Sequence, residues 1–121
     1  MRLFIADADN DVRLGVQMLV NQQPGMNVVG IATRSDGMVQ QVTATKPDVL
    51  LLNWDLPGQQ VTERMAQLRT LMSGLKVIVL SVRPEVRSPA LAAGADAFVN
   101  MSVPPDELLN ALRTVGCSSA T

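Results

Sequence analysis

Residues 47–58 read PDVLLLNWDLPG, and this stretch determines the predicted fold. Val49 to Leu52 form an apolar run that is too short for an independent helix, and the flanking proline and glycine residues indicate turns. We interpret the run as a strand buried on both faces, which is typical of parallel sheets covered by helices. Asn53 follows this strand at its carboxyl end, where open parallel sheets usually hold their functional groups.

The composition predicts one domain and argues against several kinds of site. The chain has 121 residues, 47% of them hydrophobic, and a formal net charge of -1, which suits a single buried core. Because it contains no histidine, the commonest general base and metal ligand is missing, and we expect neither an enzyme nor a metal site. The basic residues are scattered and aromatic residues are rare, so we expect no direct contact with nucleic acid.

The sequence shows no pattern for membrane insertion or secretion. No apolar run approaches the roughly 20 residues that span a bilayer, and no signal-peptide pattern precedes the first predicted strand. We therefore expect a cytoplasmic protein without membrane contact. The single cysteine, Cys117, excludes an internal disulfide. We assign residues 1–116 to one domain and residues 117–121 to a polar tail.

Short apolar runs alternate with helical patterns along the chain. Strands are predicted at residues 2–7, 28–32, 49–52, 77–81 and 97–100. Five helices are predicted between and after these strands. Asn10-Asp11 is expected to cap the first helix, and Ser35 the second, which buries Val39 and Val42. The third buries Val61, Met65 and Leu68, the fourth is centred on residues 89–93, and the fifth begins at Pro104-Pro105. This alternation predicts an α/β fold, a flavodoxin-like doubly wound five-stranded parallel sheet of order 2-1-3-4-5.

In such a sheet the ends of four strands meet in one pocket beside the point where the strand order reverses. The residues at these ends are Asp7, Asn53, Ser81 and the corner Asn100-Met101-Ser102. We take this pocket as the candidate functional site.

The motifs that surround this pocket resemble the receiver domain of bacterial response regulators over roughly residues 2–114. They are Ile5-Ala6-Asp7, PDVLLLNWDLPG, VIVLS and GADAFVNMSVPPDELL, in this order along the chain. The segment VRLGVQMLVNQQPGMNVVGIA is most similar to receivers that precede a helix-turn-helix DNA-binding domain. The resemblance implies a signalling protein of a two-component phosphorelay system.

The resemblance implies a site in which an aspartate accepts a phosphoryl group, two acidic residues hold Mg²⁺, and a lysine contacts the phosphoryl oxygens. The acceptor position falls on Asn53, the second acidic position on Ala8 and the lysine position on Met101. An amide is not the anionic oxygen nucleophile that this transfer needs, and Mg²⁺ usually requires carboxylates. We therefore predict a pseudo-receiver without phosphorylation at Asn53, with no cofactor and with weak or absent Mg²⁺ binding.

Other family positions keep part of their chemistry. The resemblance places the first acidic residue at Asp7, the hydroxyl residue at Ser81 and the switch aromatic at Phe98, while Ser102 stands where a proline often follows the lysine. Ser81 is either a structural hydroxyl or a remnant of the switch.

Three residues near the pocket allow two readings each. Asp9 and Asp55 either restore a metal site or, as we favour, cap a helix or face solvent. Trp54 either anchors a protein partner or packs on the core, and we favour packing.

Our leading hypothesis is an atypical receiver that acts as a protein-interaction or dimerisation module. Its surface would be the fourth helix, fifth strand and fifth helix, which in the family carry dimer contacts. The alternatives are the N-terminal receiver of a DNA-binding transcriptional regulator, a receiver that retains phosphoryl or metal binding through Asp7 and Asp55, and a scaffold without a signalling role.

Overall fold

The structure, a computed structural model, describes residues 1–102 and 106–120, the last five of them as backbone only. Its five strands form one parallel sheet of order β2-β1-β3-β4-β5, as predicted. The strands are β1 (Arg2–Ala6), β2 (Asn27–Ala32), β3 (Val49–Asn53), β4 (Lys76–Ser81) and β5 (Ala97–Asn100). The helices of the described part are α1 (Asn10–Asn21), α2 (Met38–Thr45), α3 (Val61–Leu71), α4 (Arg87–Ala92) and α5 (Asp106–Ala120), with a 3-10 turn η1 (Pro84–Val86) before α4.

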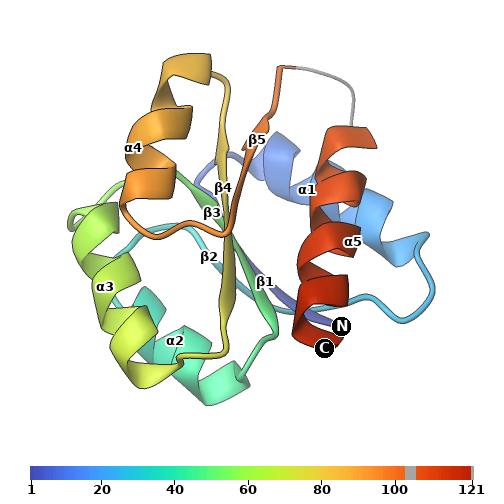
Figure 1. The fold of residues 1–121 in the computed structure, drawn as a ribbon, viewed down its shortest axis with the longest axis horizontal. Coiled ribbons are helices and arrows are strands. Elements are labelled where there is room, and N and C mark those ends of the chain that lie inside the picture. The colour runs from blue at the N-terminus through green and yellow to red at the C-terminus, as the bar shows by residue number, and fades with distance from the viewer. Residues whose placement is uncertain (103–105, 121) are drawn as a thin grey trace.

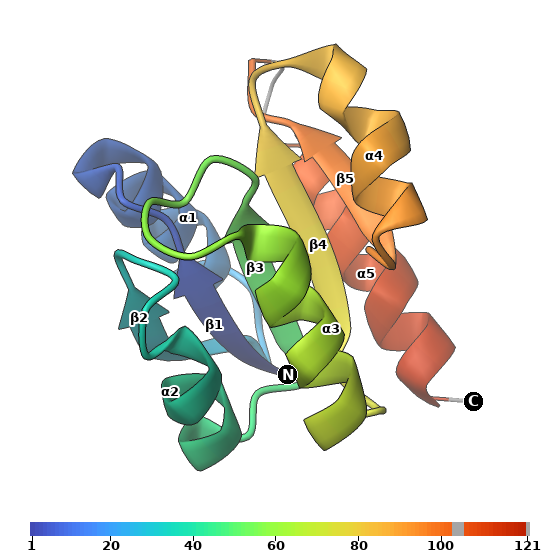
Figure 2. The same ribbon diagram turned by 90° about the vertical axis from the view of Figure 1, so that its left-hand side faces the viewer.

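Helices cover both faces of the sheet. Figure 1 shows α1 and α5 on one side and α2, α3 and α4 on the other, and Figure 2 shows the second group from the front. Along β3 the side chains alternate: Leu50 and Leu52 pack under α2, α3 and α4, whereas Val49 and Leu51 pack under α1 and α5. The apolar run of residues 49–52 is therefore buried on both faces, as predicted.

Two predicted helix caps are wrong. Helix α1 is capped by Asp9 rather than by Asn10-Asp11, and α2 is capped by the backbone of Gly37 rather than by Ser35. Ser35 is instead buried, and its hydroxyl donates a hydrogen bond to the carbonyl oxygen of Gln59, 2.5 Å away. A contact with a loop distant in sequence has taken the hydroxyl that local sequence assigned to the cap.

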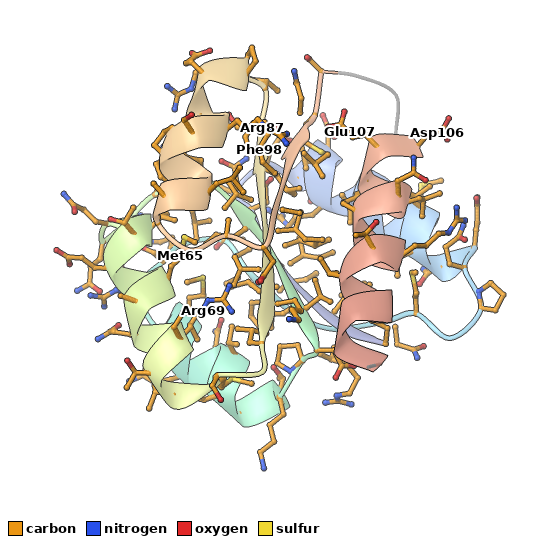
Figure 3. The ribbon with its side chains drawn as sticks, viewed as in Figure 1. Met65, Arg69, Arg87, Phe98, Asp106 and Glu107 are labelled. Atoms are coloured by element: carbon orange, nitrogen blue, oxygen red, sulfur yellow. The ribbon has the colours of Figure 1, made fainter. Side chains whose placement is uncertain are left out.

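The buried helix faces largely follow the predicted spacing. Val61, Met65 and Leu68 are buried on α3, and Figure 3 shows Met65 directed toward the sheet. On α2 the buried residues are Met38 and Val42, while the predicted Val39 is only half-buried. Helix α4 ends one residue before Ala93 and begins after η1, so it starts earlier than the segment 89–93 suggested.

Helix α5 extends beyond the predicted domain end. It runs from Asp106 to Ala120, so its backbone includes most of the predicted tail at residues 117–121. The small and polar residues of this segment led to its assignment as a tail, and glycine and serine have weak helix propensity. The predicted helix start at Pro104-Pro105 lies outside the described residues. Within the described part, no helix combines the length and apolar character needed to cross a membrane.

Candidate functional site

Asp7 and Asn53 are joined directly in the predicted pocket. The Asp7 side chain follows β1 and is almost fully buried, at 2% exposure. Its Oδ2 accepts a hydrogen bond of 3.0 Å from Asn53 Nδ2, and its Oδ1 accepts one of 2.8 Å from the backbone N–H of Asp9. A buried carboxylate is costly without such partners, and here both of its oxygens have one.

Both the nitrogen and the oxygen of the Asn53 side-chain amide form hydrogen bonds. While Nδ2 donates to Asp7, Oδ1 accepts a hydrogen bond of 2.7 Å from the backbone N–H of Asp55. The opposite amide orientation would bring two oxygens together at Asp7 and two donors together at Asp55, so the contacts define which end is which. Asn53 thus bridges the loop after β1 and the loop after β3.

Arg83 adds a charge to this edge of the sheet that the sequence analysis missed. Its guanidinium NH2 group lies 2.6 Å from Oδ1 of Asp55, in an ion pair between half-exposed side chains. The backbone N–H of Arg83 donates to the hydroxyl of Ser81 at 3.0 Å. No sequence pattern links Arg83 with Asp55, because the two residues are brought together only by the pairing of β3 with β4.

A backbone hydrogen bond joins the end of β4 at Ser81 to Met101, which follows β5. Ser81 is 2% exposed, and its carbonyl oxygen accepts a hydrogen bond of 2.8 Å from the backbone N–H of Met101. The Met101 side chain is half-buried and packs on the apolar cluster under α1 and α5. Ser102 donates from its N–H and hydroxyl to Asn100 Oδ1, at 2.9 and 2.6 Å. Asn100 Oδ1 therefore satisfies both donors of Ser102 at the corner after β5.

Phe98 lies on the opposite face of the sheet from Met101. It is 7% exposed and belongs to the same cluster as Val86 and Ala90, and Figure 3 shows it between β5 and α4. The ring is therefore part of the core under α4.

The two remaining candidates, Asp9 and Trp54, make structural contacts. Asp9 Oδ1 accepts hydrogen bonds from the N–H groups of Asp11 and Val12, at 2.8 and 3.3 Å, so Asp9 is a helix cap. Trp54 is half-buried and packs against the core. Among the residues that the structure describes, no group of three or more histidine, cysteine or acidic side chains is arranged to hold a metal ion.

The sequence also missed Arg13, which stabilises the Asp7 backbone. Its NH1 group donates a hydrogen bond of 2.8 Å to the carbonyl oxygen of Asp7, and its NH2 group one of 3.1 Å to Asn10 Oδ1. An arginine in the first turn of a helix carries no signal of this contact. The pocket is therefore a network of protein groups that satisfy one another.

Known proteins resemble the chain over nearly its whole length. The family described as the response regulator receiver domain matches residues 3–113. The nitrate/nitrite response regulator protein NarL of Escherichia coli strain K12 is 30% identical over 112 residues, which are 91% of this chain and 52% of NarL. The transcriptional regulatory protein DesR of Bacillus subtilis is 33% identical over 116 residues, 93% of this chain and 57% of DesR.

A solved structure of a response regulator is also similar to this chain. The LuxR-family two-component response regulator from Aurantimonas sp. SI85-9A1 is 25% identical, with a TM-score of 0.86, over 94% of this chain and 83% of that one. The chain spans about half the length of the curated relatives it matches. We expected no direct contact between this chain and DNA. The relatives do not support this expectation, and it remains a prediction. The matched profile, the sheet order and the relatives together place the chain in the response regulator receiver domain family.

Proposed function

We propose that this chain is the receiver module of a DNA-binding transcriptional regulator and that it signals without a phosphoryl group on Asn53. The first part rests on NarL and DesR, regulators of which this chain spans only about half. The sequence favours an interaction module over a DNA-binding regulator, whereas the relatives support the DNA-binding regulator better. In this proposal the chain acts in the cytoplasm, and DNA is bound by a further domain.

The hydrogen bond from Asn53 to Asp7 carries the second part of the proposal. The amide supplies Asp7 with a donor where receivers of the family place a second carboxylate and a cation. Mg²⁺ prefers several hard oxygen ligands, whereas the nearest Asn53 group to Asp7 is an NH₂ that repels a cation. The residues present therefore do not fit the magnesium site that the family implies, and we propose weak or absent Mg²⁺ binding and no cofactor.

The surroundings of Ser81 and Phe98 suit a receiver that remains in one state. The Ser81 hydroxyl already accepts the N–H of Arg83, and Phe98 is already packed inward. With both groups occupied by protein contacts, we propose that α4, β5 and α5 present a constant surface to a protein partner or to a second copy. Val82 and Leu91, which are 64% and 40% exposed, provide apolar contact area beside β5.

The rival candidate is phosphorylation of Asp55. Its carboxylate is 59% exposed, but its Oδ1 is paired with Arg83, so a phosphoryl donor would have to break this ion pair. An exposed pair of this kind is weak, about 0 to 1 kcal/mol, so the pair disfavours the reaction without blocking it. The rival is therefore tested directly.

The test of the phosphorylation-independent reading is an amide NMR titration with Mg²⁺ and then with beryllofluoride, a phosphoryl mimic. We expect the signals of Asp7, Asn53, Asp55 and Ser81 to stay in place. Shifts of these signals together with those of β5 and α5 would contradict this part of the proposal. A mass increase of one phosphate after treatment with acetyl phosphate, lost in an Asp55→Asn variant, would establish the rival instead.

The test of the regulator reading is separate. We expect the native protein to be longer than this chain and to shift a promoter fragment in an electrophoretic assay, while this chain alone does not. A native protein of the size of this chain, without DNA binding, would contradict the regulator reading and return the interaction module to first place.

A further inference from the structure

An apolar hollow lies between α1 and the end of β5, on the face of the sheet opposite Phe98. Its volume is about 370 Å³, which lies in the range of small-molecule sites. Its walls are mostly aliphatic and come from three elements that are far apart in the sequence. The apolar lining residues are Val12, Val16, Leu19, Val99, Met101 and Leu108.

Gly15 is the reason that the hollow reaches the α1 backbone. It lies in the interior of α1, where glycine is among the least favourable residues. A Cβ atom added at Gly15 would meet no other atom within 4 Å, so no neighbour requires the glycine. The missing side chain leaves space that belongs to the hollow.

Met101 provides an adaptable wall. Its side chain is half-buried in the cluster under α1 and α5 and also lines the hollow. Methionine is unbranched and polarizable, so it adjusts to ligands of different shape. Together with the bare backbone at Gly15, it leaves room for an apolar ligand.

The polar groups at the hollow indicate the charge of its occupant. Asp11 lines the hollow, its side chain is exposed, and no ion pair to it occurs in the described part of the chain. Asp106 and Glu107, labelled in Figure 3, begin α5 near the same end of the sheet and add negative charge there. This charge favours a cationic group at the mouth.

We propose that this hollow binds a small cationic amphiphile, with its apolar body over Gly15 and its ammonium group at Asp11. The hollow shares Asn100 and Met101 with the corner after β5, but none of Asp7, Asn53 and Ser81 lines it. The proposal goes beyond the proposed function, since it does not depend on phosphorylation or on DNA binding. Asn100 also lines the hollow, but its NH₂ group is a donor and cannot accept a hydrogen bond from an ammonium, so Asp11 is the group that holds the cation.

The experiment uses three probes of similar shape: 4-phenylbutylamine, 4-phenylbutanol and 4-phenylbutyrate. In amide NMR titrations we expect saturable shifts at Gly15, Leu19 and Met101. Binding of the amine should be about two- to fivefold tighter than that of the alcohol at low salt, as an exposed ion pair allows. The acid should bind weakest. Scattered, non-saturable shifts, or equal binding of amine and acid, would overturn the proposal.

Variants at the hollow sharpen the result. Gly15→Leu fills the space, and we expect it to weaken the amine by at least about tenfold, as a blocked pocket should. If Gly15→Leu does not fold, the smaller Gly15→Ala, whose Cβ meets no atom, is measured and should weaken binding less. Asp11→Asn should remove the preference for the amine but keep the binding of the alcohol. Unchanged amine binding in these variants would refute the site.

The control and the competing occupant are measured on the same samples. Leu14→Ala changes an α1 residue that is 52% exposed and does not line the hollow, so its probe binding should equal that of the wild type. Sedimentation of the probe-free protein completes the test. A dimer that Gly15→Leu dissociates would overturn the proposal, because a second copy of the chain would then occupy the hollow.

Discussion

Asn53 donates a hydrogen bond of 3.0 Å to Asp7 across the edge of the sheet, between the ends of β3 and β1. The two residues are 46 positions apart, and the parallel pairing of β1 with β3 brings their side chains together. An amide and a carboxylate at this distance attract, whereas two carboxylates would repel and would need a cation. The amide at residue 53 thus supplies Asp7 with a hydrogen-bond donor from within the chain.

The variant Asn53→Asp should not restore a normal switch. Ala8 and Met101 still provide neither the second metal ligand nor the counter-charge, so we expect no Mg²⁺-dependent phosphorylation with acetyl phosphate. Mass spectrometry of the intact protein measures the outcome. Robust phosphorylation of this single variant would show that these two positions matter less than their chemistry suggests.

The same variant should lose stability as the pH rises. The new carboxylate faces Asp7, and two carboxylates this close repel when both are ionised, so the variant should be less stable at neutral pH than in acid. At neutral pH we expect a loss of about 1 to 3 kcal/mol in urea unfolding, the cost of an unsatisfied buried polar pair. Asn100→Asp is the control. The new side chain can still accept the hydrogen bond from Ser102, so this variant should lose less stability.

The variant Arg83→Gln should loosen the segment between β4 and α4. It removes the ion pair with Asp55, whose coupling energy we expect to be about 0.2 to 1 kcal/mol in a double-mutant cycle with Asp55→Asn. Added salt should reduce this coupling. Hydrogen exchange at Val82 and Val86 should become faster.

Arg34→Gln is the matched control for Arg83. Arg34 forms an ion pair of 3.2 Å with Asp36, also between exposed side chains, but far from the loop after β4. The substitution of Arg34 should leave the rate of hydrogen exchange at Val82 and Val86 unchanged. Equal effects of the two variants would mean that the loss of a surface charge, rather than the bond to Asp55, is responsible.

The variant Gly58→Ala should be destabilised because the loop after β3 has no room for a side chain. Gly58 has a φ of +112°, and a Cβ there would lie 2.2 Å from Asp36 Oδ1 and 2.7 Å from Ser35 Oγ. We expect a loss of about 1 to 3 kcal/mol in chemical unfolding. Gly74→Ala, where a Cβ would meet no atom within 4 Å, should change the stability little.

Asp36 should make stability depend on acidic pH. The hydrogen bond from the Arg34 guanidinium, followed by that from the backbone N–H of Gln59, holds the pKa of the Asp36 carboxyl below its ordinary value of 3.8. A lowered pKa stabilises the fold above the unfolded pKa, and this contribution is lost as the pH falls through the folded pKa.

The measurement compares urea midpoints of the wild type and Asp36→Asn between pH 2 and 6. The difference should be constant near neutral pH and shrink in acid. In Arg34→Gln, NMR titration should show the pKa of Asp36 moved back toward its ordinary value. A pKa that does not move would assign the shift to the Gln59 contact alone.

Most of the architecture could be predicted because it follows from local pattern. The runs at residues 49–52 and 77–80 are apolar at every position, and burial on both faces of a sheet accommodates such short runs. The spacing of Val61, Met65 and Leu68 predicts the buried face of α3 for the same reason. The identity of Asn53 likewise excludes an anionic nucleophile at that position, whatever the fold.

The contacts between loops were decided only by tertiary structure. Ser35 has the chemistry of a helix cap, but the loop after β3 comes close enough to take its hydroxyl. Arg83 and Asp55 are 28 residues apart and meet because β3 and β4 pair in parallel. A hydrogen bond or ion pair of this kind depends on distance in space. The sequence by itself determined the order of strands and helices and the amide at residue 53, whereas the pairing of strands decided which groups satisfy Asp7, Ser81 and Asp55.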